Sequence, residues 1–312
     1  MGKVGFVFPG QGSQYVGMGR ELFQTEVGQQ VFETGRNVLG SDFVNLILDG
    51  PEGELQKTAN TQPAILLVSV AAFKLLDSAG LKPDYLAGHS LGEYSAHVAA
   101  GSLSLEDGLR VVRRRGELMQ EAAPVGGAMA AILSLDNLLV EEACKKASSE
   151  AGVVVPANYN CPGQLVISGE EKAVQRAIEI AKEMGAKRAL PLAVSGPFHS
   201  PYMKEVGLAL EKVLSRIAWS NPAFPIIANI NAGEVCESSE IVQTLVEQVS
   251  GAVRWEQTIK LLSDFGVDTF VECGPGKVLT GLIKKTAPGV ALLNVEDDIS
   301  LQKSLAYLKE SR

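Results

Sequence analysis

Short apolar segments alternate with longer apolar or amphipathic segments along the first third of the chain. Residues 4–8 form an apolar run that a Pro-Gly pair closes, which is typical of a buried strand. Residues 63–76 are largely apolar and predict a helix, and residues 84–87 predict a second short strand that a helix follows. Strands that alternate with helices in this way predict a parallel sheet covered on both faces.

The pattern changes between residues 125 and 196. In chain order it predicts a strand at 128–133, a helix at 137–149, strands at 153–156 and 164–168, a helix at 172–184 and a strand at 188–194. A turn-rich link at 158–163 separates the two middle strands. This β-α-β-β-α-β order is the ferredoxin-like pattern. The first pattern then returns with a helix at 201–217, a strand at 225–228, a helix ending near residue 249 and a strand at 269–272.

We therefore expect an α/β protein with two domains. Residues 1–124 and 197–312 would form a large α/β-hydrolase-like domain with a parallel sheet, and residues 125–196 a small ferredoxin-like domain inserted into it. A chain of 312 residues is long for one compact core, which agrees with this division. Apolar residues make up 46% and charged residues 21%, an ordinary balance for a globular protein.

Charge, cysteines and histidines narrow the classes of function. The net charge of −8 argues against a general nucleic-acid binder, which needs clustered Lys and Arg. The four cysteines form no CxxC pair and there are three histidines, so we expect neither a disulfide framework nor a metal site. No apolar run reaches the ~20 residues of a membrane span, and the N-terminus lacks a secretory signal pattern. We therefore expect a cytoplasmic protein without a membrane segment.

The strongest chemical signal is Gly88-His89-Ser90-Leu91-Gly92, which matches the G-x-S-x-G nucleophile elbow. It stands between an expected strand and an expected helix, as that motif requires. The glycines permit a tight turn that would present Ser90 at the end of the sheet. The amide of Leu91 would lie at a helix N-terminus, where its partial positive charge can stabilise an oxyanion.

A nucleophilic serine needs a base, and His89, His97 and His199 are the histidines of the chain. His89 is adjacent in the elbow, so its side chain should point away from that of Ser90. His97 lies ~10 Å further along the following helix, at a rise of ~1.5 Å per residue. Elimination leaves His199, and no third carboxylate is evident from the residues alone.

These residues belong to five segments that together resemble malonyl-CoA:acyl carrier protein transacylases, the acyltransferase family of fatty acid and polyketide synthesis. The segments are FPGQGSQ at 8–14, GHSLGEYS at 88–95, RRGELMQ at 114–120, GPFHS at 196–200 and ECGPGKVL at 272–279. They are spread over nearly the whole chain in family order, which makes the resemblance specific.

The resemblance implies a ping-pong transfer of a malonyl group from malonyl-CoA to the phosphopantetheine thiol of acyl carrier protein, without a cofactor. Ser90 would carry the malonyl ester and His199 would act as the base. Gln248 would supply a hydrogen-bond acceptor beside the histidine. The backbone amides of Gln11 and Leu91 would form the oxyanion hole.

The resemblance also implies substrate contacts. Arg115 would hold the free carboxylate of malonate by two parallel hydrogen bonds, which a lysine cannot reproduce. Phe198 precedes the histidine, where related polyketide acyltransferase domains carry Phe for malonyl and Ser for methylmalonyl. Asn158 matches a family position near the cleft, although an Asn there is equally typical of a turn. After Gln248 the family often has Asn-Pro before Val-x-Trp, whereas this chain has Gly251-Ala252.

Two other functions fit the residues. A serine esterase or thioesterase shares the elbow, but its histidine usually lies near the C-terminus, and the last histidine here is His199. A catalytically idle module that binds the carrier protein would not need Ser90, His199 and Arg115 together. Rapid hydrolysis without an acceptor thiol would favour the esterase, and carrier binding without turnover would favour the idle module.

Overall fold

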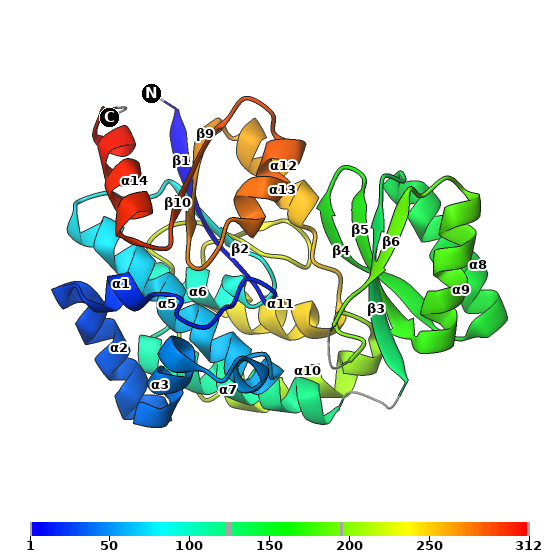
Figure 1. Cartoon of the computed structure of the whole chain (residues 1–312), viewed down its shortest axis with the longest axis horizontal. Helices are drawn as coiled ribbons and strands as arrows, with labels where there is room; N and C mark the ends of the chain where they lie inside the picture. The colour runs from blue at the N-terminus through cyan, green and yellow to red at the C-terminus, as the bar shows by residue number, and fades with distance from the viewer. Residues whose placement is uncertain (1, 123–125, 194–195, 311–312) are drawn as a thin grey trace.

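The computed structural model describes residues 2–122, 126–193 and 196–310. They form a large lobe and a small lobe, each built on its own sheet (Figure 1). The strands of the large lobe are β1 (Lys3–Phe8), β2 (Tyr85–Gly88), β7 (Ile226–Ile227), β8 (Glu234–Val235), β9 (Val267–Cys273) and β10 (Ala291–Val295). Its helices are α1 (Arg20–Phe23), α2 (Glu26–Leu39), α3 (Ser41–Asp49), α4 (Glu52–Leu55), α5 (Thr58–Ser78), α6 (Gly92–Ala99), α7 (Leu105–Glu121), α10 (Lys204–Leu214), α11 (Ser238–Ser250), α12 (Trp255–Asp264), α13 (Val278–Thr286) and α14 (Asp298–Glu310), with a 3₁₀ turn η1 at Pro201–Met203. The small lobe contains β3 (Gly127–Leu133), α8 (Asn137–Ala151), β4 (Val154–Cys161), β5 (Gln164–Glu170), α9 (Glu171–Glu183) and β6 (Arg188–Pro191).

The sheet of the large lobe has the strand order β10-β9-β1-β2-β7-β8. The parallel sheet expected from the sequence is confirmed from β10 to β7, and the short edge strand β8 runs antiparallel to β7. Alternate side chains of β1 face opposite sides of the sheet, because Phe6 and Phe8 pack in the core with α5 while Val7 packs with α12 and α13. Burial on both faces explains why the strand is apolar from residue 4 to residue 8.

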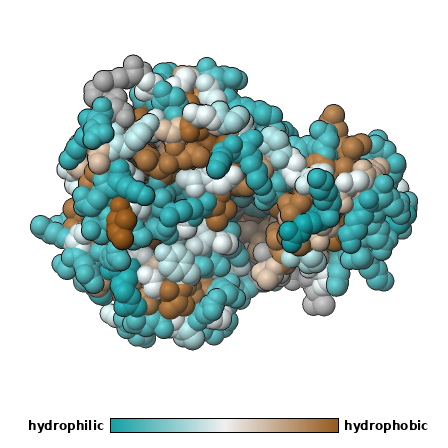
Figure 2. Space-filling view, turned by 45° about the horizontal axis from the view of Figure 1, so that its top comes forward, coloured by the Kyte–Doolittle hydropathy of each residue, from teal (hydrophilic) through white to brown (hydrophobic). Residues whose placement is uncertain are grey.

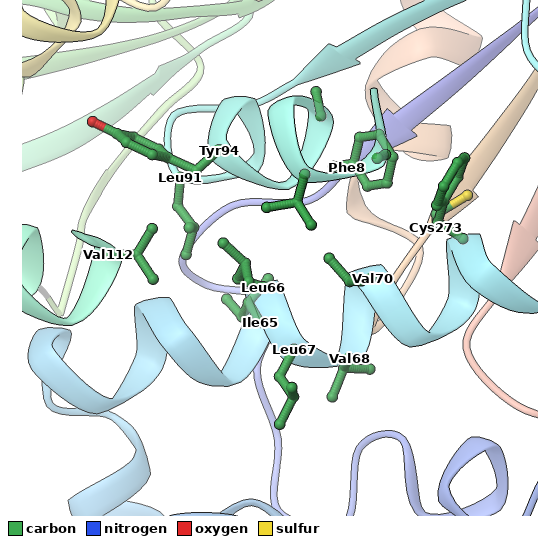
Figure 3. Packing of buried hydrophobic residues seen from close by; sticks show 14 of the residues in the cluster. Phe8, Ile65, Leu66, Leu67, Val68, Val70, Leu91, Tyr94, Val112 and Cys273 are labelled. Carbon is green, nitrogen blue, oxygen red and sulfur yellow. The ribbon is translucent and has the colours of Figure 1, made fainter. Parts of the chain in front are cut away.

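Helix α5 forms the centre of the larger core. Figure 3 shows Leu66 and Val70 beside Phe8 and Leu91, which come from β1 and the elbow. The helix is longer than predicted, because it begins at Thr58 and contains Pro63 in its second turn. Its length and mean hydropathy of 1.3 would by themselves suit a membrane span, but 78% of the apolar window is buried inside the protein. Such burial is typical of a helix in the core of a protein, and α5 is therefore a core helix.

The small lobe has the predicted β-α-β-β-α-β order, and its strands pair antiparallel in the order β4-β5-β3-β6. The prediction of a turn at 158–163 is wrong, because β4 continues to Cys161 and only Pro162-Gly163 remains between the strands. The polar side chains of this segment had indicated a turn. Asn158 is instead buried and forms an isolated bridge with Val253 of the large lobe.

The strands of the small sheet fall within residues 127–191, between α7 and η1 of the large lobe. The domain boundary predicted after residue 124 lies outside the described residues. The boundary predicted after residue 196 lies one residue beyond residues 194–195, which are also outside the described residues. The predicted end of the last small-lobe strand, residue 194, is one of these two residues. The helix predicted at 201–217 divides into η1 and α10 and ends at Leu214.

Candidate active site

Ser90 lies on the sharp turn between β2 and α6. Its φ is 51°, in the left-handed region that residues with a side chain rarely adopt. A Cβ at Gly88 would lie 1.9 Å from the carbonyl carbon of Gly92, and a Cβ at Gly92 would lie 2.0 Å from the carbonyl oxygen of Phe8. Neither position accommodates a side chain: Gly88 is required by the tightness of the elbow itself, and Gly92 by the close packing of the elbow against β1.

His199 is the histidine that reaches Ser90. Its Nε2 lies 2.8 Å from the serine Oγ. At the other side of the ring, Nδ1 lies 3.0 Å from the carbonyl oxygen of Gln248 and 3.1 Å from that of Gly251. Carbonyl oxygens only accept, so Nδ1 carries the proton and Nε2 accepts from the serine hydroxyl. The pair has the geometry of a nucleophile and its base, with main-chain carbonyls in the place of a carboxylate.

The other two histidines make contacts elsewhere. Nε2 of His89 lies 2.9 Å from Oδ1 of Asn160, so this ring points toward β4 of the small lobe. His97 is buried in α6, and its Nδ1 lies 2.9 Å from Oγ of Ser102. Both arrangements agree with the elimination argued from the sequence.

Burial, and then the charge of Arg115, lower the pKa of His199 to about 3. The unperturbed pKa of a histidine is ~6.5. At neutral pH the imidazole is therefore uncharged, and Nε2 has a free lone pair. The base can accept the serine proton without first losing one of its own.

Arg115 reaches the same site from α7. Its side chain is 1% exposed, and its guanidinium lies 5.5 Å from the ring centroid of Tyr94. The guanidinium donates to Oε1 of Gln62 at 2.9 Å, to Oε1 of Gln248 at 3.0 Å and to Oγ of Ser90 at 3.2 Å. Its Nε has no acceptor among the described residues. A buried cation with a spare N–H beside the nucleophile is suited to binding an anionic group of a substrate.

Ser90, His199 and Arg115 line one cavity of about 100 Å³. Four more of the residues predicted for the site line it too: Gln11, Leu91, Asn158 and Phe198. They come from both lobes, and Figure 2 shows the surface hollowed between the two. Gln248 lies fully buried behind the cavity. The cavity is much smaller than the ~300–1,000 Å³ of sites for drug-sized ligands, so it suits a short acyl group.

Three polar residues around the elbow were missed in the sequence interpretation: Gln62, Glu93 and Asn229. Glu93 is fully buried in the first turn of α6, and this burial raises its pKa to about 7. Asn229 follows β7, and its Oδ1 accepts the amide hydrogen of Ser90 at 2.6 Å. Its place directly after a predicted strand was a usable signal, because sites gather at the carboxyl ends of parallel strands. No comparable signal marked Gln62, which lies within a helix.

The segment after Gly251 ties the two lobes together. The amide of Val253 donates to the carbonyl of Ala157 at 2.8 Å, and the carbonyl of Val253 accepts from the amide of Tyr159 at 2.9 Å. Strand β4 is thereby joined to the loop whose carbonyl orients His199. These bonds hold the loop where the family pattern often has Asn-Pro.

Within residues 2–122, 126–193 and 196–310, no group of three or more His, Cys, Asp or Glu could hold a metal ion. Cys144, Cys161, Cys236 and Cys273 are unpaired thiols.

Comparison with known sequences gives one family. Residues 5–305 match the family described as the acyl transferase domain. The chain is 46% identical over 312 residues to the malonyl CoA-acyl carrier protein transacylase of Bacillus subtilis strain 168, which covers 99% of this chain and 98% of that protein. It is 43% identical over 298 residues to the Staphylococcus aureus strain COL protein of the same name, covering 95% and 96% of the two chains.

Solved structures are similar over both lobes. An acyl carrier protein S-malonyltransferase from Vibrio cholerae superposes with a TM-score of 0.94 at 43% identity, covering 97% of this chain and 99% of that one. A malonyl-transacylase in complex with a type II polyketide acyl-carrier protein gives a TM-score of 0.94 at 44% identity, covering 98% and 99%. With nearly its whole length matched at these identities, the chain belongs to the acyl transferase family that contains the malonyl CoA-acyl carrier protein transacylases.

Proposed function

We propose that this protein transfers a malonyl group from malonyl-CoA to the phosphopantetheine thiol of acyl carrier protein, in fatty acid biosynthesis. The meeting of Ser90, His199 and Arg115 in one buried cavity carries the proposal. The serine oxygen lies 2.8 Å from the base and 3.2 Å from the guanidinium. A serine and a base alone serve any acyl transfer or hydrolysis, whereas the buried cation selects an acyl group with a free carboxylate. Relatives named for this reaction support the same function.

In the first half-reaction, Ser90 attacks the thioester carbonyl of malonyl-CoA. As the Oγ–C bond forms, Nε2 of His199 takes the serine proton and negative charge develops on the carbonyl oxygen. The backbone amides of Gln11 and Leu91 are proposed to donate to that oxygen. Both residues line the cavity, and Leu91 is the N-cap of α6, so the helix dipole adds to the effect. The C–S bond then breaks, and the CoA sulfur leaves with the proton from His199.

In the second half-reaction, the pantetheine thiol attacks the malonyl ester on Ser90. His199 takes the thiol proton and returns it to the serine oxygen as the ester C–O bond breaks. The carbonyls of Gln248 and Gly251 hold the imidazole by its Nδ1–H in both halves, and they stabilise the positive charge that the ring carries briefly. Free enzyme is regenerated, and the thioester of the carrier protein is released.

The acyl group would be selected by three residues of the cavity. Arg115 would bind the free carboxylate of the malonyl group, and hydrogen bonds to a charged group contribute ~1.5–3 kcal/mol. Phe198 is 5% exposed and lines the cavity next to His199, so its ring leaves little room for an α-methyl branch. Asn158 lines the cavity from β4 and would offer the acyl group a polar contact.

The reaction as proposed has two partners, malonyl-CoA and acyl carrier protein. It needs no cofactor, because the nucleophile, the base and the anion-binding groups all belong to the protein. We further propose that the protein works in the cytoplasm, where its unpaired cysteines would stay reduced.

Mass spectrometry of the intact protein mixed with malonyl-CoA tests the covalent step. We expect one malonyl adduct that maps to Ser90 and disappears when acyl carrier protein with a free pantetheine thiol is added. Ser90→Ala should form no adduct. An adduct on that variant, or turnover by hydrolysis alone in the presence of carrier protein, would contradict the proposal.

A further inference from the structure

We propose that Glu93 is a positioning residue that holds the strained backbone of Ser90 through Gln248 and Asn229. The inference rests on the proposed function in one respect, that Ser90 is the nucleophile. Glu93 lies three residues after the serine, at the start of α6, and its side chain is 0% exposed. It does not bond to His199, so it is not the missing acid of a triad.

One carboxylate oxygen of Glu93 binds two donors. Oε2 accepts from the side-chain amide of Gln248 at 2.8 Å and from the backbone amide of Asn229 at 3.0 Å. These donors come from α11 and from the segment after β7, so the carboxylate joins three separate parts of the large lobe. Oε1 has no partner among the described residues.

Both partners of Glu93 bind the peptide groups on either side of the nucleophile. Nε2 of Gln248 donates to the carbonyl oxygen of Ser90 at 2.9 Å. Asn229 accepts the amide hydrogen of Ser90 at 2.6 Å and donates to the carbonyl oxygen of Gly88 at 2.6 Å. Each side-chain amide has its nitrogen toward acceptors and its oxygen toward a donor, so the network admits one orientation. The elbow is therefore held from both sides by residues that Glu93 anchors.

This network explains how the serine keeps its unfavourable backbone conformation. A residue with a side chain at a φ of 51° persists where its surroundings impose the conformation. A buried carboxylate is itself costly, and an apolar residue of similar size is often as stable or more stable. The role we assign to Glu93 is therefore to supply an acceptor oxygen near Ser90 rather than to stabilise the fold.

Two substitutions of Glu93 separate the effect of its acceptor oxygen from the effect of its charge. Glu93→Gln keeps an oxygen that can accept from Gln248 and Asn229, and it removes the charge. Glu93→Met has a similar length and no acceptor oxygen, so Gln248 and Asn229 lose the carboxylate oxygen they share while the core stays filled. Glu272 supplies the matched control, because it is another buried carboxylate with a pKa raised to about 7 by burial, and its oxygens bind the amides of Leu279 and Thr280 instead of the elbow.

The experiment measures the rate at which a fluorophosphonate probe labels Ser90, together with the melting temperature of each variant. We expect Glu93→Met to label about tenfold to a hundredfold more slowly, which is the effect of a small misplacement of a reacting group. Glu93→Gln should stay within about threefold of the wild type, and Glu272→Met within about twofold per folded molecule. In malonyl transfer the loss should appear in kcat, with KM for malonyl-CoA little changed, because the groups that bind the substrate remain.

The inference would be overturned if the probe labels Glu93→Met at the wild-type rate. It would also be overturned if Glu93→Gln is labelled as slowly as Glu93→Met. If Glu93→Met does not fold, Glu93→Asp takes its place, because its shorter chain withdraws the acceptor. Labelling of Glu93→Asp at the wild-type rate would overturn the inference in the same way. A wild type whose Ser90 is not labelled at all would instead refute the proposed function, and the inference with it.

Discussion

The backbone carbonyl of Gln248 and the imidazole of His199 are hydrogen-bonded, with the carbonyl oxygen 3.0 Å from Nδ1. The side chain of Gln248 makes separate contacts, donating to the carbonyl of Ser90 at 2.9 Å and accepting from Arg115 at 3.0 Å. One residue thus orients the base through its main chain and contacts the nucleophile and the cation through its side chain. The two functions can be separated by mutation, because a carbonyl survives any side-chain replacement.

Gln248→Ala should therefore lower kcat by about tenfold, as a side chain that positions other groups is lost, and leave the orientation of His199 intact. His199→Ala should lower kcat by about 10²–10⁴-fold, the usual contribution of a general base. Steady-state malonyl transfer measures both variants. Equal losses would show that the side chain of Gln248, rather than its carbonyl, supports the base.

The reactivity of Ser90 should not depend on a group that titrates near pH 6.5. The pKa of His199 is lowered to about 3, mainly by burial, so the imidazole stays unprotonated as the pH falls from 8 to 5. Fluorophosphonate labelling across this range should show no loss with a midpoint near 6.5. Measuring Glu93→Gln in parallel removes the titration of that carboxyl from the profile. A midpoint near 6.5 in both proteins would contradict the neutral, buried base.

Arg115→Met should remove the preference for malonyl-CoA over acetyl-CoA. Methionine has a similar length and no charge, so the free carboxylate loses its partner while acetyl transfer keeps its nucleophile and base. Loss of hydrogen bonds of ~1.5–3 kcal/mol corresponds to a fall of about tenfold to a hundredfold in kcat/KM for malonyl-CoA. The ratio of kcat/KM for the two thioesters gives the result. An unchanged ratio would place malonyl recognition elsewhere.

The buried carboxyl of Glu93 predicts a pH dependence of stability. Burial raises its pKa from 4.5 to about 7, so between these values the folded protein holds a proton that the unfolded chain has lost. The free energy of unfolding therefore falls as the pH rises through this window. Glutamine does not titrate, so Glu93→Gln should gain stability relative to the wild type between pH 5 and pH 8, by up to about 3 kcal/mol.

Urea unfolding at the two pH values measures this gain. Glu272→Gln should behave similarly, because burial raises the pKa of Glu272 to about 7 as well. If the free energies of unfolding of Glu93→Gln and the wild type differ by the same amount at both pH values, Glu93 is not protonated in the folded protein near neutral pH.

Gly10→Ala should disturb the proposed oxyanion hole. A Cβ at Gly10 would lie 2.4 Å from the carbonyl oxygen of His89, so the loop that carries Gln11 must move away from the elbow. Loss of one oxyanion donor typically costs ~10²–10³-fold in kcat. Gly53→Ala is the control, because a Cβ there meets nothing within 4 Å and should leave kcat unchanged. Full activity of Gly10→Ala would remove Gln11 from the mechanism.

The local pattern of apolar residues and glycines was sufficient to predict the architecture. The apolar run of β1, the strand–turn–helix around Ser90 and the ferredoxin-like order of the small lobe all follow from hydrophobic periodicity and glycine placement. The pattern was insufficient where polar residues face the partner lobe. Asn158 and Asn160 resemble a turn in sequence, and they lie in β4 because the large lobe supplies their contacts.

The amino-acid sequence alone was enough to identify the nucleophile elbow, the candidate base and the family. The elbow and the family follow from residue types at fixed spacings within short motifs, whereas the base follows by elimination among three histidines. Three further features depend on the folded arrangement: two carbonyls hold His199, Arg115 is buried against Ser90, and Glu93 anchors the elbow through Gln248 and Asn229. The last contacts join residues more than 130 positions apart. Hydrogen bonds between such distant residues depend on how helices and strands pack, which no local pattern of residues records.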